Sequence, residues 1–309
     1  MNTRVCAITI TFNPDLAIFE RQLESLHAQC DVILVDNGSE PNVLRRIEQL
    51  SQRYGCHLLA LGENEGIAAA QNYGVKLIEN EKSECEYLLF LDHDSIPKPD
   101  FVAAMVEEYL RLERLSGAIG VLGPAIYEPR ARTYYGFHVL RGLLYARAGP
   151  EAMADDAIVC VTLNSAGTFC PLRVMQSVGP YDERLFIDHV ETEWCFRASH
   201  LGYWLYGSRN VDLVHQMGDD VFHLKFARKR VNLPYRSPHR HRYLVRNSIE
   251  MLRRNYIPTI WKCYCVVKIV LTFLLFGILA GDSASQRRAI IGGISDGLRG
   301  RLGKISAPH

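Results

Sequence analysis

The 309-residue sequence has no internal repeat, no low-complexity stretch and no series of long apolar runs. With 48% apolar and 22% charged residues, its composition excludes a disordered chain, a collagen-like repeat and a transporter with many membrane spans. The nine cysteines are scattered without CxxC spacing, which is typical of reduced thiols in the cytosol. The first strand-like stretch runs into Asn13-Pro14-Asp15 and not into a cleavage site, so we expect no signal peptide.

Signals for nucleophilic catalysis and for nucleic-acid binding are also weak. No cysteine has neighbours that would activate its thiol, and no nucleophile elbow is recognisable, so catalysis by Ser/His/Asp or Cys/His is poorly supported. The basic end of the chain lacks a helix-turn-helix, an RNA-recognition signature and a zinc finger. We therefore expect no nucleic-acid partner.

The two ends of the chain differ in charge, although the net charge is only +1. Residues 1–221 carry 18 basic and 31 acidic side chains, whereas residues 222–309 carry 17 basic and 3 acidic ones. A basic tail that contains an apolar run favours contact with an anionic surface, such as lipid head groups or a polyanionic glycan.

Strand-like and helix-like segments alternate through the first part of the chain. In the first helix we expect Asn13 to be the N-cap and Pro14 the first helical residue. A strand-helix alternation of this kind predicts an α/β fold, with a parallel sheet covered by helices on both faces. The apolar spacing predicts strands at 4–12, 32–35, 57–61 and 87–91, and helices at 14–29, 45–54, 67–78 and 191–201.

Polar segments follow three of these predicted strands. In a parallel sheet the carboxyl ends of the strands lie at one edge, where ligands gather. The sequence therefore predicts a site built from all three. The segments are Thr11-Phe12-Asn13-Pro14, Asp36-Asn37-Gly38-Ser39 and Asp92-His93-Asp94-Ser95.

The segment YLLFLDHDS is the sharpest of these signals. Asp92 and Asp94 directly follow a buried strand, which has no structural need for two anions. Their oxygens suit Mg²⁺ or Mn²⁺, and such a cation can neutralise a leaving diphosphate. His215 ends another apparent strand and is a third candidate ligand for the metal or phosphate. The alternative is a solvated turn in which Asp94 caps the following helix.

Two further segments are candidates for contacts with a nucleotide or sugar. Gly66, in GENEGIAAAQNYG, allows close backbone approach, and free N–H groups there can meet a phosphate. Asp36 can accept hydrogen bonds from a nucleobase or a ribose. A tightly packed helix and an Asx turn explain these two features about as well.

The segment LFIDHVETEWCFRASHLGY brings three acids together just before and inside a predicted helix. Asp188, Glu191 and Glu193 lie within six residues, and Glu193 can pair with Arg197 one turn later. Capping needs only one acid. A surplus carboxylate beside a metal-nucleotide site is a natural general base for a hydroxyl acceptor.

Taken in order, these motifs resemble the family-2 inverting glycosyltransferases. The resemblance rests on TFNP, VDNGS, NEGIAAAQNYG, LDHDS and FIDHVETEWCFRA, and on a downstream YLVRN at 243–247. It covers roughly residues 4–255, and FIDHVETE is most similar to bacterial rhamnosyltransferases of cell-surface glycan assembly, including lipopolysaccharide.

The resemblance implies a glycosyltransferase-A fold, a nucleotide-sugar donor and a divalent cation. By position it assigns the metal to Asp92, Asp94 and His215. It assigns the nucleotide-sugar contacts to Thr11, Asn13, Asp36, Asn64, Gly66, Asn72 and Asp92.

The resemblance also implies that Glu191 is the general base. Many relatives carry Glu-Asp where this chain has Val190-Glu191, so Asp188 is the alternative base. The implied reaction is a single displacement, in which an acceptor hydroxyl attacks the anomeric carbon of dTDP-L-rhamnose and inverts it. The acceptor would be a cell-surface glycan or its lipid-linked precursor.

Other functions stay open at this level. Another hexosyltransferase of the family would use a UDP- or GDP-sugar, and a non-catalytic glycan- or lipid-binding module would keep only the fold. A sugar nucleotidyltransferase needs a basic, glycine-rich loop near the N-terminus, which TFNPDLAIFE does not provide.

The charge asymmetry suggests a catalytic domain over 1–221, with a nucleotide-sugar half to about 123 and an acceptor half from about 124. The basic region 222–309 contains the apolar run 269–281, and Lys268 interrupts its extension back to Cys263. Cationic flanks on both sides disfavour a span. We expect a cytoplasmic protein that lies peripherally on the inner face of the cytoplasmic membrane; a buried core helix is the alternative.

Overall fold

The computed structural model describes residues 4–82, 84–130, 132–142, 144–153, 155–215, 220–226, 229–280 and 282–305, and describes the backbone alone at 152, 220–226 and 229–234. The chain divides into two compact units. The N-terminal unit comprises Met1–Glu183 and Val190–His215, and the C-terminal unit comprises Arg184–His189 and Gln216–His309. The assignment of catalysis to residues 1–221 and of membrane association to residues 222–309 stays a prediction.

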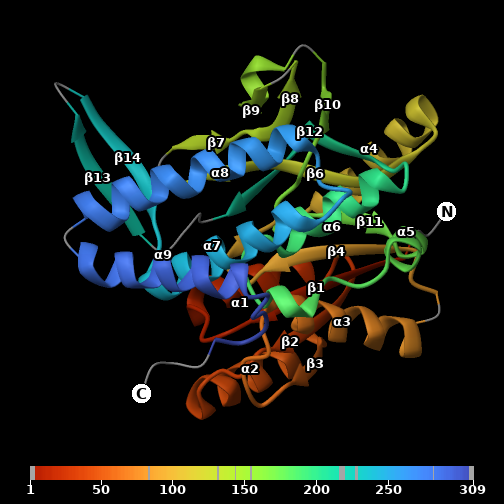
Figure 1. Ribbon diagram of the computed structural model, residues 1–309. Coiled ribbons are helices and arrows are strands. Elements are labelled where there is room, and N and C mark those ends of the chain that lie inside the picture. The colour runs from red at the N-terminus through yellow and green to blue at the C-terminus, as the bar shows by residue number, and fades with distance from the viewer. Residues whose placement is uncertain are drawn as a thin grey trace. The chain divides into compact units, whose positions relative to one another are not determined.

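A mixed, largely parallel ten-stranded sheet forms the centre of the described part of the N-terminal unit (Figure 1). Its main path runs β10-β12-β6-β11-β4-β1-β2-β3, with β5 paired to β12 and β7 to β6. The strands are β1 (Val5–Thr11), β2 (Asp31–Asp36), β3 (His57–Ala60), β4 (Tyr87–Asp92), β5 (Ser95–Ile96), β6 (Ile119–Glu128), β7 (Thr133–Tyr135), β10 (Ala157–Cys160), β11 (Phe169–Pro171) and β12 (Trp204–His215).

Six of these strands point the same way. Strands β1, β2, β3 and β4 pair in parallel, and β6 is parallel to β12. The short β11 is antiparallel to both β4 and β6, so those two strands share one direction. The end of β12 therefore lies at the same edge of the sheet as the ends of β1, β2 and β4.

Helices connect and cover these strands, and a separate hairpin, β8 (Phe137–Arg141) with β9 (Leu144–Ala148), follows β7. Apolar side chains of strands and helices together make the core, including Ile8, Leu89, Phe19, Leu23 and Tyr109, all of them buried. The α-helices are α1 (Leu16–Leu26), α2 (Pro41–Tyr54), α3 (Ile67–Glu81), α4 (Phe101–Ser116), α5 (Leu172–Val178) and α6 (Val190–His200). Short 3₁₀ turns lie at η1 (Pro150–Ala152) and η2 (Glu183–Leu185).

The expected elements of the first half are confirmed, but the start of the first helix is wrong. Helix α1 begins at Leu16, and its N-cap is Asp15, whose carboxylate accepts from the backbone N–H groups of Ala17 and Ile18. Asn13 cannot serve as the cap because it has a left-handed φ of 46° and its side chain accepts from the N–H of Glu40.

In the residues that the structure describes, the C-terminal unit is helical apart from one hairpin. Helices α7 and α9 pack closely, with Val245, Ile249 and Ile290 buried between them and Phe273 of α8 against this cluster. Figure 1 shows the long α8 as a rod, and the helix continues directly into the π-helical turn η3. The elements are β13 (Asp220–Phe226), β14 (Lys229–Tyr235), α7 (Pro238–Arg253), α8 (Thr259–Leu274), η3 (Leu275–Leu279) and α9 (Ser283–Leu298).

A GxSxG sequence in the C-terminal region lies inside a helix and is not a nucleophile elbow. Gly293, Ser295 and Gly297 have the GxSxG spacing of a nucleophile elbow. They lie inside α9, where Gly293 and Gly297 allow close approach to α7: an added Cβ would meet backbone oxygens of Arg242 and Arg246 at 2.6 and 2.9 Å. The glycines therefore serve helix packing, and no strand-to-helix elbow exists there.

Candidate active site

The three polar segments predicted from the sequence meet at the carboxyl edge of the sheet. The Thr11 hydroxyl donates to the Asp36 carboxylate at 2.9 Å, which joins the ends of β1 and β2. His93, after β4, has its Nδ1 3.3 Å from the carbonyl oxygen of Ile10. The direction of the strands places the three segments together.

Asp92, Asp94 and His215 form a cluster at this edge. The ligand atoms of the three side chains all lie within 4.8 Å of one another. His215 Nδ1 is 3.1 Å from Asp94 Oδ1, and its Nε2 is 3.8 Å from Asp92 Oδ2. Asp94 does not cap the next helix, because α4 begins at Phe101 after Asp100.

Mutual electrostatics set the protonation of this cluster. Burial raises the pKa of Asp92, and His215 only partly offsets that effect. Burial also acts to raise the pKa of Asp94, but the hydrogen bond with His215 and the charges of His215 and His93 together outweigh it and lower that pKa. The same two carboxylates raise the pKa of His215 against the effect of its burial. Two oxygens and one imidazole nitrogen are a suitable donor set for a divalent cation.

Side chains that were not among the predicted site residues support Asp92, although Gln71 lies within NEGIAAAQNYG. The Ser165 hydroxyl donates to Asp92 Oδ1 at 3.4 Å and accepts from Gln71 Nε2 at 3.0 Å. Gln22 Nε2 donates to the backbone oxygens of Asp92 and Ser95, each at 2.7 Å. These partners are 70 to 94 residues apart in the chain, and no local pattern identifies them.

Asp36 is fully buried and already has partners for both carboxylate oxygens. Besides Thr11, it accepts from the N–H and the hydroxyl of Ser39, as in an Asx turn. The turn needs Gly38, whose φ is +85° and whose added Cβ would lie 2.5 Å from the backbone of Glu63. This geometry favours a structural role for the Asp36 side chain, and its contact with a nucleobase stays a prediction.

The other predicted nucleotide-sugar contacts organise loops of the N-terminal unit. Asn13 donates its N–H to the Ser39 hydroxyl. Asn64 Oδ1 accepts from Asn37 Nδ2 and from the N–H of Gly66, the N-cap of α3, which has a φ of +89°. Asn72 holds the backbone of Tyr181 through both ends of its amide. These contacts leave the ligand-binding roles as predictions.

Glu191 lies in the first turn of α6, where the helix dipole favours a carboxylate. Its side chain is partly exposed, whereas Glu193 is buried. The predicted pairing of Glu193 with Arg197 is confirmed, with nitrogen–oxygen distances of 3.0 Å. Glu193 is thus occupied in a buried ion pair, and Glu191 is the more accessible acid of the helix.

Asp188 lies in the C-terminal unit and is clamped by arginines. Its side chain is only 5% exposed, and it pairs with Arg236 and with both Nε and a terminal nitrogen of Arg240, the latter two at 3.0 Å. Burial acts to raise the pKa of Asp188, but the two guanidinium groups outweigh it and hold that pKa well below the ordinary range. A carboxylate held in this way accepts a proton poorly.

The YLVRN motif explains how the Asp188 segment keeps an unusual backbone. Phe186 and Asp188 both have left-handed φ values of 64°, which costs energy in residues other than glycine. Asn247 Nδ2 donates to three carbonyl oxygens of this segment at 2.8–2.9 Å, and the fully buried Arg246 donates to the Leu185 oxygen at 3.0 Å. These bonds offset the strain within the unit.

Comparison with known proteins agrees with the fold and identifies the family. The family model for glycosyl transferase family 2 matches residues 6–161, half of the chain. The chain belongs to this family. It is 29% identical to the dTDP-rhamnosyl transferase RfbF of Shigella flexneri over 310 residues, which cover 98% of each chain.

Solved structures of glycosyltransferases share the fold at low sequence identity. GalNAc-T7, solved with UDP, GalNAc and Mn²⁺, has a TM-score of 0.59 and 14% identity; the match covers 94% of this chain but only 54% of that one. Residues 1–349 of Staphylococcus aureus TarS, solved with UDP-GlcNAc, have a TM-score of 0.55 and 14% identity, over 96% of this chain and 81% of the other. The chain is therefore a glycosyltransferase with the glycosyltransferase-A type of α/β fold.

Proposed function

We propose that this glycosyltransferase moves L-rhamnose from dTDP-L-rhamnose to a hydroxyl of a bacterial cell-surface glycan or its lipid-linked precursor, with inversion at the anomeric carbon. The observation that carries the sugar assignment is the 29% identity to a dTDP-rhamnosyl transferase over nearly the whole of both chains. The FIDHVETE segment at 186–193 supports the same sugar through its resemblance to bacterial rhamnosyltransferases.

The Asp92, Asp94 and His215 cluster is the proposed site of a Mg²⁺ or Mn²⁺ ion. Its three donors lie close enough together to bind one cation. When bound, the cation neutralises charge on the leaving nucleotide diphosphate. The chain itself positions the donors, because Ser95 and Asp94 both lie 3.1 Å from His215 Nδ1 and limit the rotation of the imidazole.

Glu191 is the proposed general base. It belongs to the same unit as the cation cluster and is partly exposed in the first turn of α6. In the proposed step its carboxylate takes the proton of the acceptor hydroxyl while the hydroxyl oxygen attacks the anomeric carbon. Attack opposite the leaving group inverts that carbon. Asp188 is the weaker candidate because Arg236 and Arg240 already neutralise it.

The donor is tested by calorimetric titration in Mn²⁺ with dTDP-L-rhamnose, UDP-glucose, UDP-galactose and GDP-mannose. We expect dTDP-L-rhamnose to bind at least about tenfold more tightly than the others, a difference of about 1.4 kcal/mol. A preference for a uridine or guanosine donor would reject rhamnose and leave a different hexosyltransferase of the family. The same four donors are also incubated with the protein and assayed for hydrolysis. If none is hydrolysed, the protein is better explained as a non-catalytic binding module.

Loss of the cation should abolish transfer. We expect Asp94→Ala to lower turnover by about a thousandfold or more, because it removes a metal ligand and a partner of His215. EDTA should have the same effect on the wild type, and added Mn²⁺ should reverse it. Asp100→Ala, an exposed acid near the start of α4, is the control. Full activity in EDTA would show that the reaction needs no metal.

Replacement of the base should affect chemistry and not binding. Glu191→Gln keeps the size of the side chain but removes proton acceptance, so we expect kcat to fall by about 10²–10⁴-fold with donor affinity nearly unchanged. Asp188→Asn is the matched comparison and should mainly lower stability, since it leaves two arginines without their anion. An inactive Asp188→Asn protein beside an active Glu191→Gln protein would reverse the two assignments.

We also propose that α8 attaches the protein peripherally to an anionic membrane. The helix that continues from α8 through η3, Thr259–Leu279, has a mean hydropathy of 2.1 in its most apolar window, of which 22% is buried, and is long enough to cross a bilayer. One face, including Trp261, Cys265 and Phe276, is buried in the C-terminal unit. The opposite face is exposed and almost wholly apolar: Tyr264, Val266, Val267, Val270, Leu271, Leu274, Ile278 and Leu279.

An amphipathic position at the membrane surface fits this helix better than a span. A spanning helix would have to pull its buried face away from α7, a helix rich in arginine. Lys262 lies near its start, and the exposed Arg287 and Arg288 follow its end, so cations flank the apolar face on both sides. Such an arrangement inserts its apolar side chains into one leaflet while the cations meet lipid phosphates.

Membrane attachment is tested by sedimentation with vesicles. The full chain should pellet with phosphatidylglycerol vesicles and much less with phosphatidylcholine, and alkaline carbonate should release it from membranes. The double variant Val270→Glu, Leu271→Glu should lose most of the binding. Leu144→Glu, at an even more exposed apolar residue of the N-terminal unit, should not lose binding. Equal pelleting of the double variant would remove the membrane role, and resistance to carbonate would indicate a span.

A further inference from the structure

Strand β12 contains an irregularity shortly before His215. Its Ser208 lies opposite Pro124 of β6, but the next residue of β6, Ala125, lies opposite Asp212. Residues 209–211 therefore have no partner on β6 and form a three-residue bulge. After the bulge, regular pairing resumes as far as Val214 on β6, and His215 pairs with Ser95 of β5.

The bulge determines how far β12 reaches. A strand advances about 3.3 Å per residue, so three unpaired residues shorten it by about 10 Å relative to regular pairing. Without the bulge, Arg209 would lie opposite Ala125, where Asp212 now lies, and His215 would lie about 10 Å beyond its present place. The 3.1 Å contact between His215 and Asp94 depends on this shortening.

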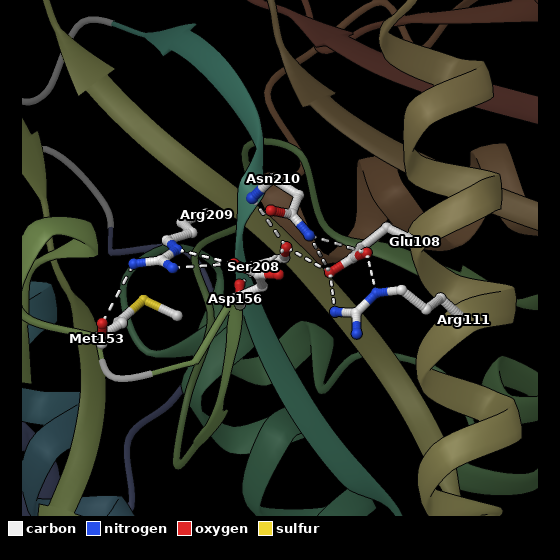
Figure 2. Close-up of polar contacts among 7 residues, drawn as sticks. All are labelled: Glu108, Arg111, Met153, Asp156, Ser208, Arg209 and Asn210. Atoms are coloured by element: carbon white, nitrogen blue, oxygen red, sulfur yellow. Dashed lines mark hydrogen bonds and ion pairs between the residues drawn. The ribbon is translucent and has the colours of Figure 1, made fainter.

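One side of the bulge is fastened by Glu108 of α4, as Figure 2 shows. The Ser208 hydroxyl donates to Glu108 Oε1 at 2.6 Å, and Asn210 Nδ2 donates to the two carboxylate oxygens at 3.4 and 3.3 Å. Arg111 pairs with the same carboxylate through two nitrogens at 2.7 and 2.8 Å. Glu108 is thus bonded to the residues that begin and fill the bulge.

The other side of the bulge is fastened by Arg209 (Figure 2). Its N–H donates to the backbone oxygen of Asp156 at 2.9 Å, and its guanidinium group pairs with the Asp156 carboxylate at 3.0 Å. Asp212, which ends the bulge, pairs with Lys98 at 2.7 Å. Arg209, Asp156 and Lys98 are exposed, so these ion pairs contribute little compared with the buried bond between Ser208 and Glu108.

A carboxylate is unusual at the buried position of Glu108. It is 5% exposed on the inward face of α4, where its neighbours in the core are the buried Met105, Tyr109 and Leu112. A helix that only packs against a sheet needs apolar side chains there, and burial of a carboxylate is costly without partners. Here the partners are the bulge residues themselves, together with Arg111.

We propose that Glu108 is a positioning residue for the cation site: by holding the three-residue bulge of β12, it sets the place of His215 beside Asp92 and Asp94. This inference rests on the proposed function, because it takes His215 to be a metal ligand. Glu108 does not touch the cation or the donor. Its effect passes along the four residues of β12 between Asn210 and His215.

The test measures Mn²⁺ affinity by electron paramagnetic resonance of the free ion, in the presence of dTDP, together with the free energy of unfolding. We expect Glu108→Ala to weaken Mn²⁺ binding by about 10- to 100-fold. A loss of this size is common when a residue that orients a metal ligand is removed. Glu108→Gln keeps an acceptor for Ser208 and should stay within about threefold of the wild type.

Tyr109→Phe is the matched control. It removes a buried 2.8 Å hydrogen bond from the neighbouring residue of α4 to the carbonyl oxygen of Ile119, at the start of β6, and so destabilises the same contact between helix and sheet without touching the bulge. Its Mn²⁺ affinity should equal that of the wild type. If Glu108→Ala does not fold, Ser208→Ala and Asn210→Ala remove the same bonds singly and should each weaken Mn²⁺ binding.

The outcomes separate the inference from the proposed function. Wild-type Mn²⁺ affinity in folded Glu108→Ala, or in both Ser208→Ala and Asn210→Ala, overturns the positioning role and leaves the cation site intact. Equal losses in Glu108→Ala and Tyr109→Phe overturn it too, because general destabilisation then explains both. A wild-type protein that binds no Mn²⁺ overturns the cation site and the positioning role together.

Discussion

The site depends on one constraint: two carboxylates at the end of a buried strand must be kept close together. Asp92 and Asp94 repel each other, and burial penalises both charges. His215 relieves this repulsion because β12 runs parallel to β6 and brings the imidazole to within 3.1 Å of Asp94. The direction of the strands, the two-residue strand β5 and the bulge of β12 all serve this contact. A cation would relieve the same repulsion further.

Around this cluster, polar side chains of the chain satisfy one another. Thr11, Asp36 and Ser39 form one connected set, and Gln71, Ser165 and Asp92 form another. Such networks hold loop backbones at the carboxyl edge in a single conformation before a ligand arrives. Preorganisation of this kind lowers the cost of ordering the site when the donor binds.

In the C-terminal unit, arginines hold a loop segment in place. Arg236, Arg240 and Arg246 all contact the segment Arg184–His189, through the Asp188 carboxylate or through backbone oxygens. Part of the strong positive charge of the tail is therefore structural. Lys262 and the exposed Arg287 and Arg288 flank the apolar face of α8, and the proposed membrane contact would use them.

The sequence determined the α/β class, the elements of the first half and the three polar segments, because apolar periodicity is a local signal. The grouping of His215 with Asp92 and Asp94 was implied by the family resemblance, and the structure brings the three side chains together. The tertiary structure decided what those signals cannot carry. The N-cap of α1 is Asp15 and not the predicted Asn13, because the Asn13 side chain bonds to a residue 27 positions away. Glu108 and Ser208 meet across 100 residues, and Asn247 reaches Leu185 across 62. Contacts at such separations depend on how the elements pack, and no pattern within one element records them.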